Sequence, residues 1–166
     1  INRSEAVEIG GIKQWVKYQG ENDHAPVLLF LHGGPGNSVI SYADRFTTEL
    51  QKQFVVVHWD QRETGKTAAM NKSQQPLSVS LFVNDAIELI NFLRARFAQD
   101  KIYLIGHSWG GYLGLRVAIE KPELLHAYLA MSPMINQLES ERVSLQVLLD
   151  KAVRENDNEA LAELKS

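Results

Sequence analysis

Hydrophobic and polar residues follow two different patterns along the first part of the chain. Residues 5–20, EAVEIGGIKQWVKYQG, roughly alternate in polarity on either side of Gly10-Gly11, which is typical of two strands joined by a tight turn. The stretches APVLLFLHGGPG (25–36) and KQFVVVHWDQR (52–62) instead contain continuous apolar runs, typical of strands buried on both faces of a parallel sheet. Residues 38–51 between them are long enough for a crossover helix. The pattern predicts an antiparallel edge hairpin followed by parallel strands.

A helical pattern follows in residues 77–97, where apolar side chains recur close to helical spacing and Ser78 or Ser80 is available as the N-cap. These apolar residues are Val83, Ile87, Ile90, Leu93 and Phe97.

Strand and helix patterns then alternate. KIYLIG (101–106) has the composition of a strand, a helix is expected from about Gly110 to Lys121 before Pro122, and LLHAYLAMS (124–132) is again apolar. This alternation predicts an α/β fold with right-handed crossovers and helices on both faces of a mostly parallel sheet.

The pattern changes near residue 136, after which only helical spacing is found. One helix is expected over residues 138–155, and a second near Asn156, with Glu159 three residues later completing a candidate capping box. We therefore expect two parts, residues 1–135 as the α/β core and residues 136–166 as the start of an added helical layer.

Composition narrows the class of protein. The 166 residues are 45% hydrophobic and 22% charged, as expected for one globular core. The net charge of −3 and the scattered basic residues argue against a nucleic-acid partner.

The sequence also bears on where the protein is located. The apolar runs are too short to cross a membrane, and the first residues lack signal-peptide features. The absence of cysteine fits a reducing compartment, so a cytoplasmic protein is expected. The sequence carries no signal for an oligomeric state.

The strongest chemical motif lies in GHSWGG, residues 106–111. Gly106, Ser108 and Gly110 have the spacing G-x-S-x-G between a predicted strand and a predicted helix. On such a sharp bend a serine hydroxyl is exposed at the end of the strand, and the helix N-terminus favours developing negative charge. Ser108 is thus a candidate nucleophile, and the alternative is an ordinary turn residue.

A second motif, LHGGPG at residues 31–36, also follows a predicted buried strand. A glycine-rich turn exposes backbone N–H groups, as an oxyanion hole requires. The alternative is an ordinary Gly-Pro turn.

Together, HGGPG, DQR at residues 60–62 and GHSWGG, in that order, resemble the α/β-hydrolase superfamily and especially its proline iminopeptidase branch. The resemblance extends over about residues 5–135. It implies that Ser108 is the nucleophile and that the amides of Gly34 and Trp109, with Gly33 beside them, form the oxyanion hole.

The resemblance also assigns supporting residues. Asp60 and Arg62 match a mainly structural segment that holds the loop after its strand. From their positions next to the motifs, His32 and His107 are expected to shape the site. The sequence departs from the family at Glu63, where relatives usually have glycine. The shape of this loop, and any substrate contact made there, therefore cannot be carried over.

Other patterns resemble known binding motifs but do not meet their requirements. TGKT at residues 64–67 resembles the end of a phosphate-binding loop, but Asp60 occupies the position of the required glycine. In GGPGNSV, Val39 stands where a dinucleotide fingerprint needs glycine or alanine. No pair among His24, His32, His58, His107 and His126 has the i, i+4 spacing of a zinc motif, so no metal or cofactor is expected, and His24 and His126 are expected to be exposed.

A serine nucleophile needs a histidine base and an acid, which in this fold follow it in the chain. His126 is expected at the wrong end of a strand, and Asp150 and Asp157 fall on the added helices. The resemblance implies that relatives continue through a helical cap to strands that carry the acid and the histidine. We therefore expect residues 136–166 to begin that cap.

Three hypotheses follow. The first is a serine hydrolase that acts through an acyl-enzyme and resembles aminopeptidases releasing N-terminal proline from short peptides or small molecules. The second is a carboxylesterase or amidase with the same chemistry, because the fold does not determine the substrate. The third is a non-catalytic binding module of hydrolase fold. Ser108 argues against epoxide hydrolases and haloalkane dehalogenases, for which the resemblance would require aspartate.

Overall fold

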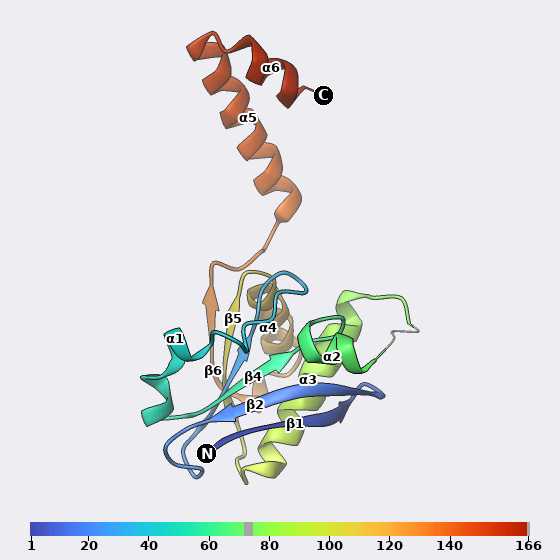
Figure 1. Ribbon diagram of the computed structural model, residues 1–166, viewed down its shortest axis with the longest axis vertical. Helices are drawn as coiled ribbons and strands as arrows, with labels where there is room; N and C mark the ends of the chain where they lie inside the picture. The colour runs from blue at the N-terminus through green and yellow to red at the C-terminus, as the bar shows by residue number, and fades with distance from the viewer. Residues whose placement is uncertain (72–74, 166) are drawn as a thin grey trace. The chain divides into compact units, whose positions relative to one another are not determined.

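A mixed six-stranded sheet organises the first of two compact units in the computed structural model, which describes residues 1–71 and 75–165 (Figure 1). The units are Ile1–Pro133 and Met134–Ser166. The strand order is β1-β2-β4-β3-β5-β6. The strands are β1 (Asn2–Ile9), β2 (Ile12–Gln19), β3 (Val27–Leu31), β4 (Val55–Asp60), β5 (Ile102–His107) and β6 (Leu125–Met131).

The predicted edge hairpin is confirmed. Strand β1 pairs antiparallel with β2, with Ile9 opposite Ile12, and β2 pairs antiparallel with β4. Gly10 and Gly11 make the turn with φ values of 55° and 73°, a backbone conformation that suits glycine.

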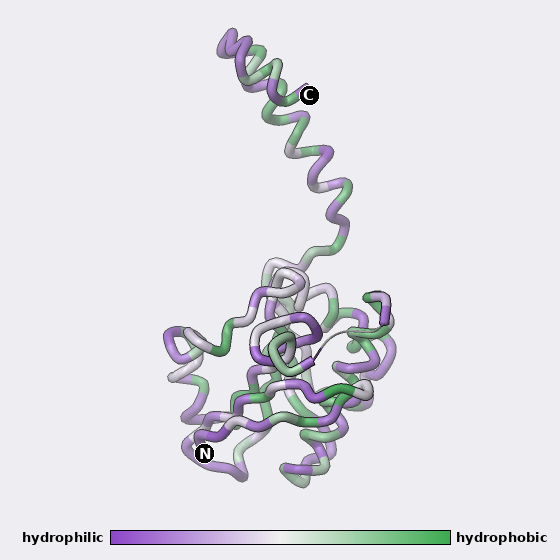
Figure 2. The backbone as a smooth tube through the Cα atoms, turned by 45° about the vertical axis from the view of Figure 1, so that its right-hand side comes forward, coloured by the Kyte–Doolittle hydropathy of each residue, from purple (hydrophilic) through white to green (hydrophobic). Residues whose placement is uncertain are grey.

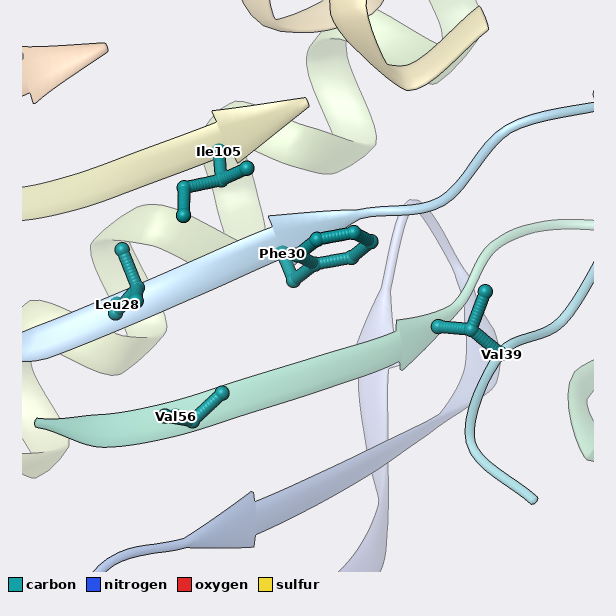
Figure 3. Close-up of a cluster of buried hydrophobic side chains, with 5 residues drawn as sticks. All are labelled: Leu28, Phe30, Val39, Val56 and Ile105. Atoms are coloured by element: carbon teal, nitrogen blue, oxygen red, sulfur yellow. The ribbon is translucent and has the colours of Figure 1, made fainter. Parts of the chain in front are cut away.

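The central strands β4, β3, β5 and β6 run parallel, as their continuous apolar patterns predicted. Alternate residues of β3 face opposite sides of the sheet, and all five are buried. On one side Leu28 and Phe30 pack with Val39, Val56 and Ile105 in the cluster shown in Figure 3. Both faces of the sheet are therefore covered.

The helices of the first unit lie on both faces of this sheet. They are α1 (Asp44–Thr47), α2 (Gly65–Met70), α3 (Val79–Arg96) and α4 (Trp109–Glu120), with short 3₁₀ turns η1 (Leu50–Lys52) and η2 (Pro122–Leu124). Phe46 of α1 packs against Phe30 with ring centroids 5.5 Å apart, whereas α3 and α4 pack together on the other face, behind the sheet in Figure 1.

Helix α3 has the predicted cap but a different buried stripe. The Ser78 hydroxyl accepts a hydrogen bond from the N–H of Leu81 over 3.2 Å. Ile87 and Phe97 are only half-buried, because the core-facing side of the helix is centred on other residues. Its fully buried residues are Phe82, Val83, Asp85, Ala86, Leu89, Ile90 and Leu93.

The expected crossover helix over residues 38–51 is shorter than predicted. The segment contains only the single turn α1 and the beginning of η1, and the rest is turn and loop. Length alone allowed a longer helix, but residues 38–43 form the loop and turn that lead into α1.

The second unit contains α5 (Gln137–Glu155) and α6 (Asn158–Leu164). The predicted capping box at Asn156 and Glu159 is wrong by one residue. Asn156 ends α5 in a left-handed conformation, and Asp157 caps α6 by accepting a hydrogen bond from the Ala160 N–H over 3.0 Å. Hydrophobic and hydrophilic residues alternate along α5, as Figure 2 shows, and the assignment of residues 136–166 to a cap stays a prediction.

No helix within residues 1–71 and 75–165 combines the length and the apolar character needed to cross a membrane.

Candidate active site

Ser108 lies on a sharp turn between β5 and α4. Its backbone has φ 54° and ψ −116°, a conformation that a residue with a side chain rarely adopts. The turn is held on both sides, because the Ser108 N–H donates to the carbonyl of Met131 over 3.0 Å and the Ser108 carbonyl accepts from the Tyr112 N–H over 3.2 Å. The predicted strand, turn and helix are therefore present around Ser108.

The two flanking glycines allow this turn to be so tight. A Cβ at Gly106 would lie 2.6 Å from the carbonyl carbon of Gly110, and a Cβ at Gly110 would lie 2.6 Å from the carbonyl oxygen of His32. Neither distance is compatible with a side chain. The spacing G-x-S-x-G is thus a packing requirement where helix α4 starts against β3 and β5.

The Ser108 side chain is half-buried, and its hydroxyl makes no capping hydrogen bond to α4. It does not act as an ordinary N-cap serine. Trp109 is the first residue of the 12-residue helix, so its N–H has no acceptor within the helix and is available to an oxyanion.

The glycine-rich turn after β3 lies directly against this serine. A Cβ at Gly33 would stand 3.2 Å from the Cβ of Ser108 and 3.4 Å from Nδ1 of His107. Gly34 follows with φ 116°, a conformation that strongly favours glycine. The structure therefore brings together the HGGPG turn and the GHSWGG turn, two motifs about 70 residues apart in the sequence.

His32 holds this glycine-rich turn in place. The Gln61 N–H donates to His32 Nε2 over 3.2 Å, so Nδ1 carries the proton and donates to the Gly33 carbonyl over 2.8 Å. Burial lowers the pKa of His32, and the bond to Gly33 only partly opposes this effect. His32 is therefore a neutral, structural histidine beside the candidate oxyanion hole.

Gln61 is the residue of this site that the sequence did not single out. It is fully buried, its Nε2 donates to the His32 carbonyl over 3.1 Å, and its Oε1 accepts from Trp109 Nε1 over 3.1 Å. Its position between Asp60 and Arg62 in the DQR motif was the available signal.

Asp60 supports the loop that follows β4. Its carboxylate accepts hydrogen bonds from the Ser38 hydroxyl and, over 2.9 Å, from the Lys66 N–H. Its carbonyl accepts from the Thr67 hydroxyl over 2.5 Å, and Thr67 in turn accepts from the Trp15 N–H. Asp60 therefore connects the loop that contains Ser38, the loop after β4 and helix α2 to the sheet.

Arg62 is bound to helix α3 and to the hairpin turn. Its guanidinium donates to both carboxylate oxygens of Asp85, over 2.5 and 3.0 Å, and to the Gly10 carbonyl over 2.6 Å. Gln14 donates a further hydrogen bond to Asp85 over 2.8 Å. Burial raises the pKa of Asp85, while the hydrogen bonds from Arg62 and Gln14 act in the opposite direction.

A cavity of about 370 Å³ adjoins the two turns. Pro35, which follows Gly34, and Trp109, which follows Ser108, form part of its wall. Most of the remaining wall is apolar. Glu63 lies at this cavity with φ 55°, which explains in physical terms why glycine suits this position.

Within residues 1–71 and 75–133, no hydrogen bond joins the Ser108 hydroxyl to a histidine or an acidic side chain. His126 is exposed and stacks on Tyr103 near the start of β6, at the end of the parallel strands opposite Ser108. Asp150 and Asp157 belong to the second unit. His24 is exposed as expected, and His107, at the end of β5, is exposed beside Gly33. No cluster of three potential metal-binding side chains is found among the residues that the structure describes.

Comparisons with known proteins agree with this architecture. Residues 26–162 match the family model of the alpha/beta hydrolase fold. The chain is 38% identical over 140 residues to the probable aminopeptidase YbaC of Bacillus subtilis, covering 84% of this chain and 44% of that protein. It is 29% identical over 128 residues to the proline iminopeptidase of Heyndrickxia coagulans, covering 76% and 41%. The chain thus spans less than half the length of these two relatives.

Solved structures show the same fold. A proline iminopeptidase-related protein of Thermus thermophilus superposes with a TM-score of 0.71 at 23% identity, covering 99% of this chain and 56% of that one. An epoxide hydrolase of Vigna radiata superposes with a TM-score of 0.60 at 30% identity, covering 76% and 37%. These similarities confirm the predicted mostly parallel sheet with its antiparallel hairpin as an α/β-hydrolase fold.

Proposed function

Because this chain belongs to the α/β-hydrolase fold family, we propose that it carries the nucleophile and oxyanion hole of a serine hydrolase, most similar in reaction to proline iminopeptidases. The observation that carries the proposal is the contact between the two turns. Ser108 has a strained backbone, makes no capping bond, and lies against Gly33 of the glycine-rich turn.

In this mechanism the Ser108 hydroxyl attacks the carbonyl carbon of the substrate and loses its proton to a histidine base. The resemblance implies that this histidine lies in the part of the relatives that follows residues 136–166. The N–H groups of Trp109 and Gly34 stabilise the negative oxygen of the tetrahedral intermediate. The carbon–nitrogen bond then breaks, the amine leaves with the proton, and water hydrolyses the acyl-enzyme.

Two named relatives support the substrate class. The aminopeptidase and the proline iminopeptidase noted above both act, by their names, at the N-terminus of a peptide. The similarity to an epoxide hydrolase supports the fold, but the residue at the turn in this chain is serine. We therefore propose a short peptide as the substrate, and the alternative is a carboxylesterase or amidase that acts on small acyl compounds.

Labelling with a fluorophosphonate tests the nucleophile, because this reagent reacts with activated serines. We expect the intact natural protein to be labelled and the Ser108→Ala variant to lose the label. Ser132 provides a matched control, since it too follows a strand and has a positive φ of 43°. Ser132→Ala should keep the label, and a label that persists in Ser108→Ala would contradict the assignment.

Hydrolysis of a proline arylamide compared with that of a short-chain acyl ester tests the substrate class. We expect turnover of the arylamide. Turnover of the ester alone would favour the carboxylesterase, and no labelling or turnover would favour the non-catalytic alternative.

A further inference from the structure

The cavity between the two turns and the start of α3 is apolar over most of its wall. Leu77, Val79 and Phe82, at the start of α3, lie on one side, with Pro35 and Trp109 on the side of the two turns. Phe82 and Trp109 pack edge to face with ring centroids 5.5 Å apart. The cavity therefore favours a small apolar group, and its wall includes Trp109, the residue that follows Ser108.

Two charged residues also line this cavity, and only one of them has a partner. The Arg62 guanidinium is occupied by Asp85 and by the Gly10 carbonyl. Glu63 is exposed, and across residues 1–71 and 75–165 no ion pair or hydrogen bond engages its carboxylate. The nearby Lys66 ammonium lies over the Trp15 ring at 4.3 Å from its centroid. The Glu63 carboxylate is therefore the uncompensated charge at the cavity.

Glu63 also has an unfavourable backbone conformation. Its φ of 55° costs a residue with a Cβ about 1 kcal/mol or more relative to glycine. The Thr64 N–H donates to the Gln61 carbonyl over 3.1 Å, so the turn around Glu63 is closed by the backbone and does not depend on its side chain. Among the described residues, the Glu63 carboxylate makes no hydrogen bond or ion pair that would stabilise the fold.

We propose that the Glu63 carboxylate binds the ammonium group of the substrate's N-terminal residue. The apolar part of that substrate residue then fills the cavity. The ligand class is a small cyclic or aliphatic amine that is protonated at neutral pH and carries its carbonyl toward Ser108. This proposal rests on the proposed function and deepens it by naming the residue that selects a free N-terminal amine. It differs from a purely structural role, in which the charge of residue 63 would be irrelevant.

Binding of two ring compounds of equal size tests this without requiring catalysis. Pyrrolidine is a cation and cyclopentanol is neutral, and each is titrated into the intact natural protein by calorimetry or ligand-observed NMR. We expect Glu63→Gln to weaken pyrrolidine binding by about tenfold, the value of a charged hydrogen bond in a partly exposed site, and to leave cyclopentanol binding unchanged.

Control variants separate charge from folding. Glu63→Gly removes the carboxylate and the backbone strain, so it should lose pyrrolidine affinity without losing thermal stability. Glu123→Gln removes the same charge from η2, which precedes β6 at the opposite end of the parallel strands, and should bind pyrrolidine like the unmodified protein. In hydrolysis, Glu63→Gln should raise KM for a proline arylamide more than it changes kcat.

Three results would overturn the proposal. They are equal pyrrolidine affinity in the unmodified protein and Glu63→Gln, an equal loss for both ring compounds, and no pyrrolidine binding to the unmodified protein. Ser108→Ala should still bind pyrrolidine. A failure of the nucleophile assignment would therefore appear in labelling, and a failure of the Glu63 proposal would appear in binding.

Discussion

The Gln61 side chain accepts a hydrogen bond from the indole Nε1 of Trp109 over 3.1 Å. Through its Nε2 the same side chain holds the carbonyl of His32, so one buried amide connects the glycine-rich turn to the start of α4. The two backbone segments that carry the proposed oxyanion hole are thus joined by the side chain of a fully buried residue.

Replacing Gln61 by leucine should therefore separate two effects. It leaves the His32 carbonyl and the Trp109 indole N–H without partners, at a cost of about 1–3 kcal/mol for each buried group. We expect a loss of unfolding free energy of about 2–6 kcal/mol in urea titration. We also expect slower fluorophosphonate labelling of Ser108 under conditions where the protein is fully folded.

A double-mutant cycle with Trp109→Phe provides the control. Because both changes remove the same hydrogen bond, their effects on stability should not add. Additive losses would contradict a direct coupling between Gln61 and Trp109.

Gly33→Ala should slow the chemistry more than it destabilises the protein. The added methyl group would meet the Ser108 Cβ at 3.2 Å and the His107 carbonyl at 3.3 Å, so these neighbours must shift by a few tenths of an ångström. Catalysis is sensitive to such displacements, and we expect labelling to slow by about tenfold or more with a small change in melting temperature. An unchanged labelling rate would show that Gly33 does not border the reactive serine.

Breaking the Arg62–Asp85 ion pair should be strongly destabilising. Both side chains are almost completely inaccessible, so removal of one leaves a buried charge without its partner. Arg62→Met should cost about 3–5 kcal/mol in urea unfolding, whereas Arg62→Met with Asp85→Leu should recover much of that loss. A double variant no more stable than Arg62→Met would argue that other contacts dominate the effect.

His58 is a buried histidine with one nitrogen paired. The Thr47 hydroxyl donates its proton to the Ala43 carbonyl, so the Thr47 oxygen accepts a hydrogen bond from His58 Nε2 over 3.4 Å. The unprotonated nitrogen of the His58 ring is therefore Nδ1. Nδ1 has no partner among residues 1–71 and 75–165, and the ring packs between Phe30 and Phe46. Burial lowers the pKa of His58 from 6.5 to about 4.

This pKa shift predicts the direction of a pH effect on stability. Between pH 6.5 and about 4 the unfolded chain binds a proton at His58 and the folded protein does not, so acidification favours unfolding. The contribution is fully present above pH 6.5 and is lost as the pH falls to about 4, amounting to up to about 3 kcal/mol. The unfolding free energy of His58→Gln should fall less steeply across this range. Parallel pH profiles for the two proteins would contradict the prediction.

The sequence was sufficient for those parts of the fold that local chemistry controls. Gly10-Gly11 predicted the hairpin because the turn requires positive φ, and Ser78 predicted the start of α3 because a hydroxyl can satisfy a free N–H. The glycines on either side of Ser108 likewise predicted a sharp turn between a strand and a helix. Each of these signals acts within a few residues along the chain.

Packing between distant segments was not predictable in the same way. The buried stripe of α3 includes Phe82 and Asp85 because Trp109 and Arg62 lie opposite them, and nothing in the helical spacing identifies those partners. The length of the segment before β4 likewise did not predict that α1 would be a single turn. Gln61 has the type and position of an ordinary strand-end residue until the tertiary structure places two backbone turns beside it.

The sequence by itself therefore determined the strand and helix types, the two glycine-containing turns and the identity of the candidate nucleophile, since these depend on local backbone preferences and on side-chain chemistry. Only the tertiary structure decided that Gly33 lies against Ser108, that Gln61 joins their two turns, and that Glu63 lines an apolar cavity without a partner among the described residues. These relationships depend on which strands are neighbours in the sheet, and the parallel order β4-β3-β5 brings the ends of three distant segments to one edge.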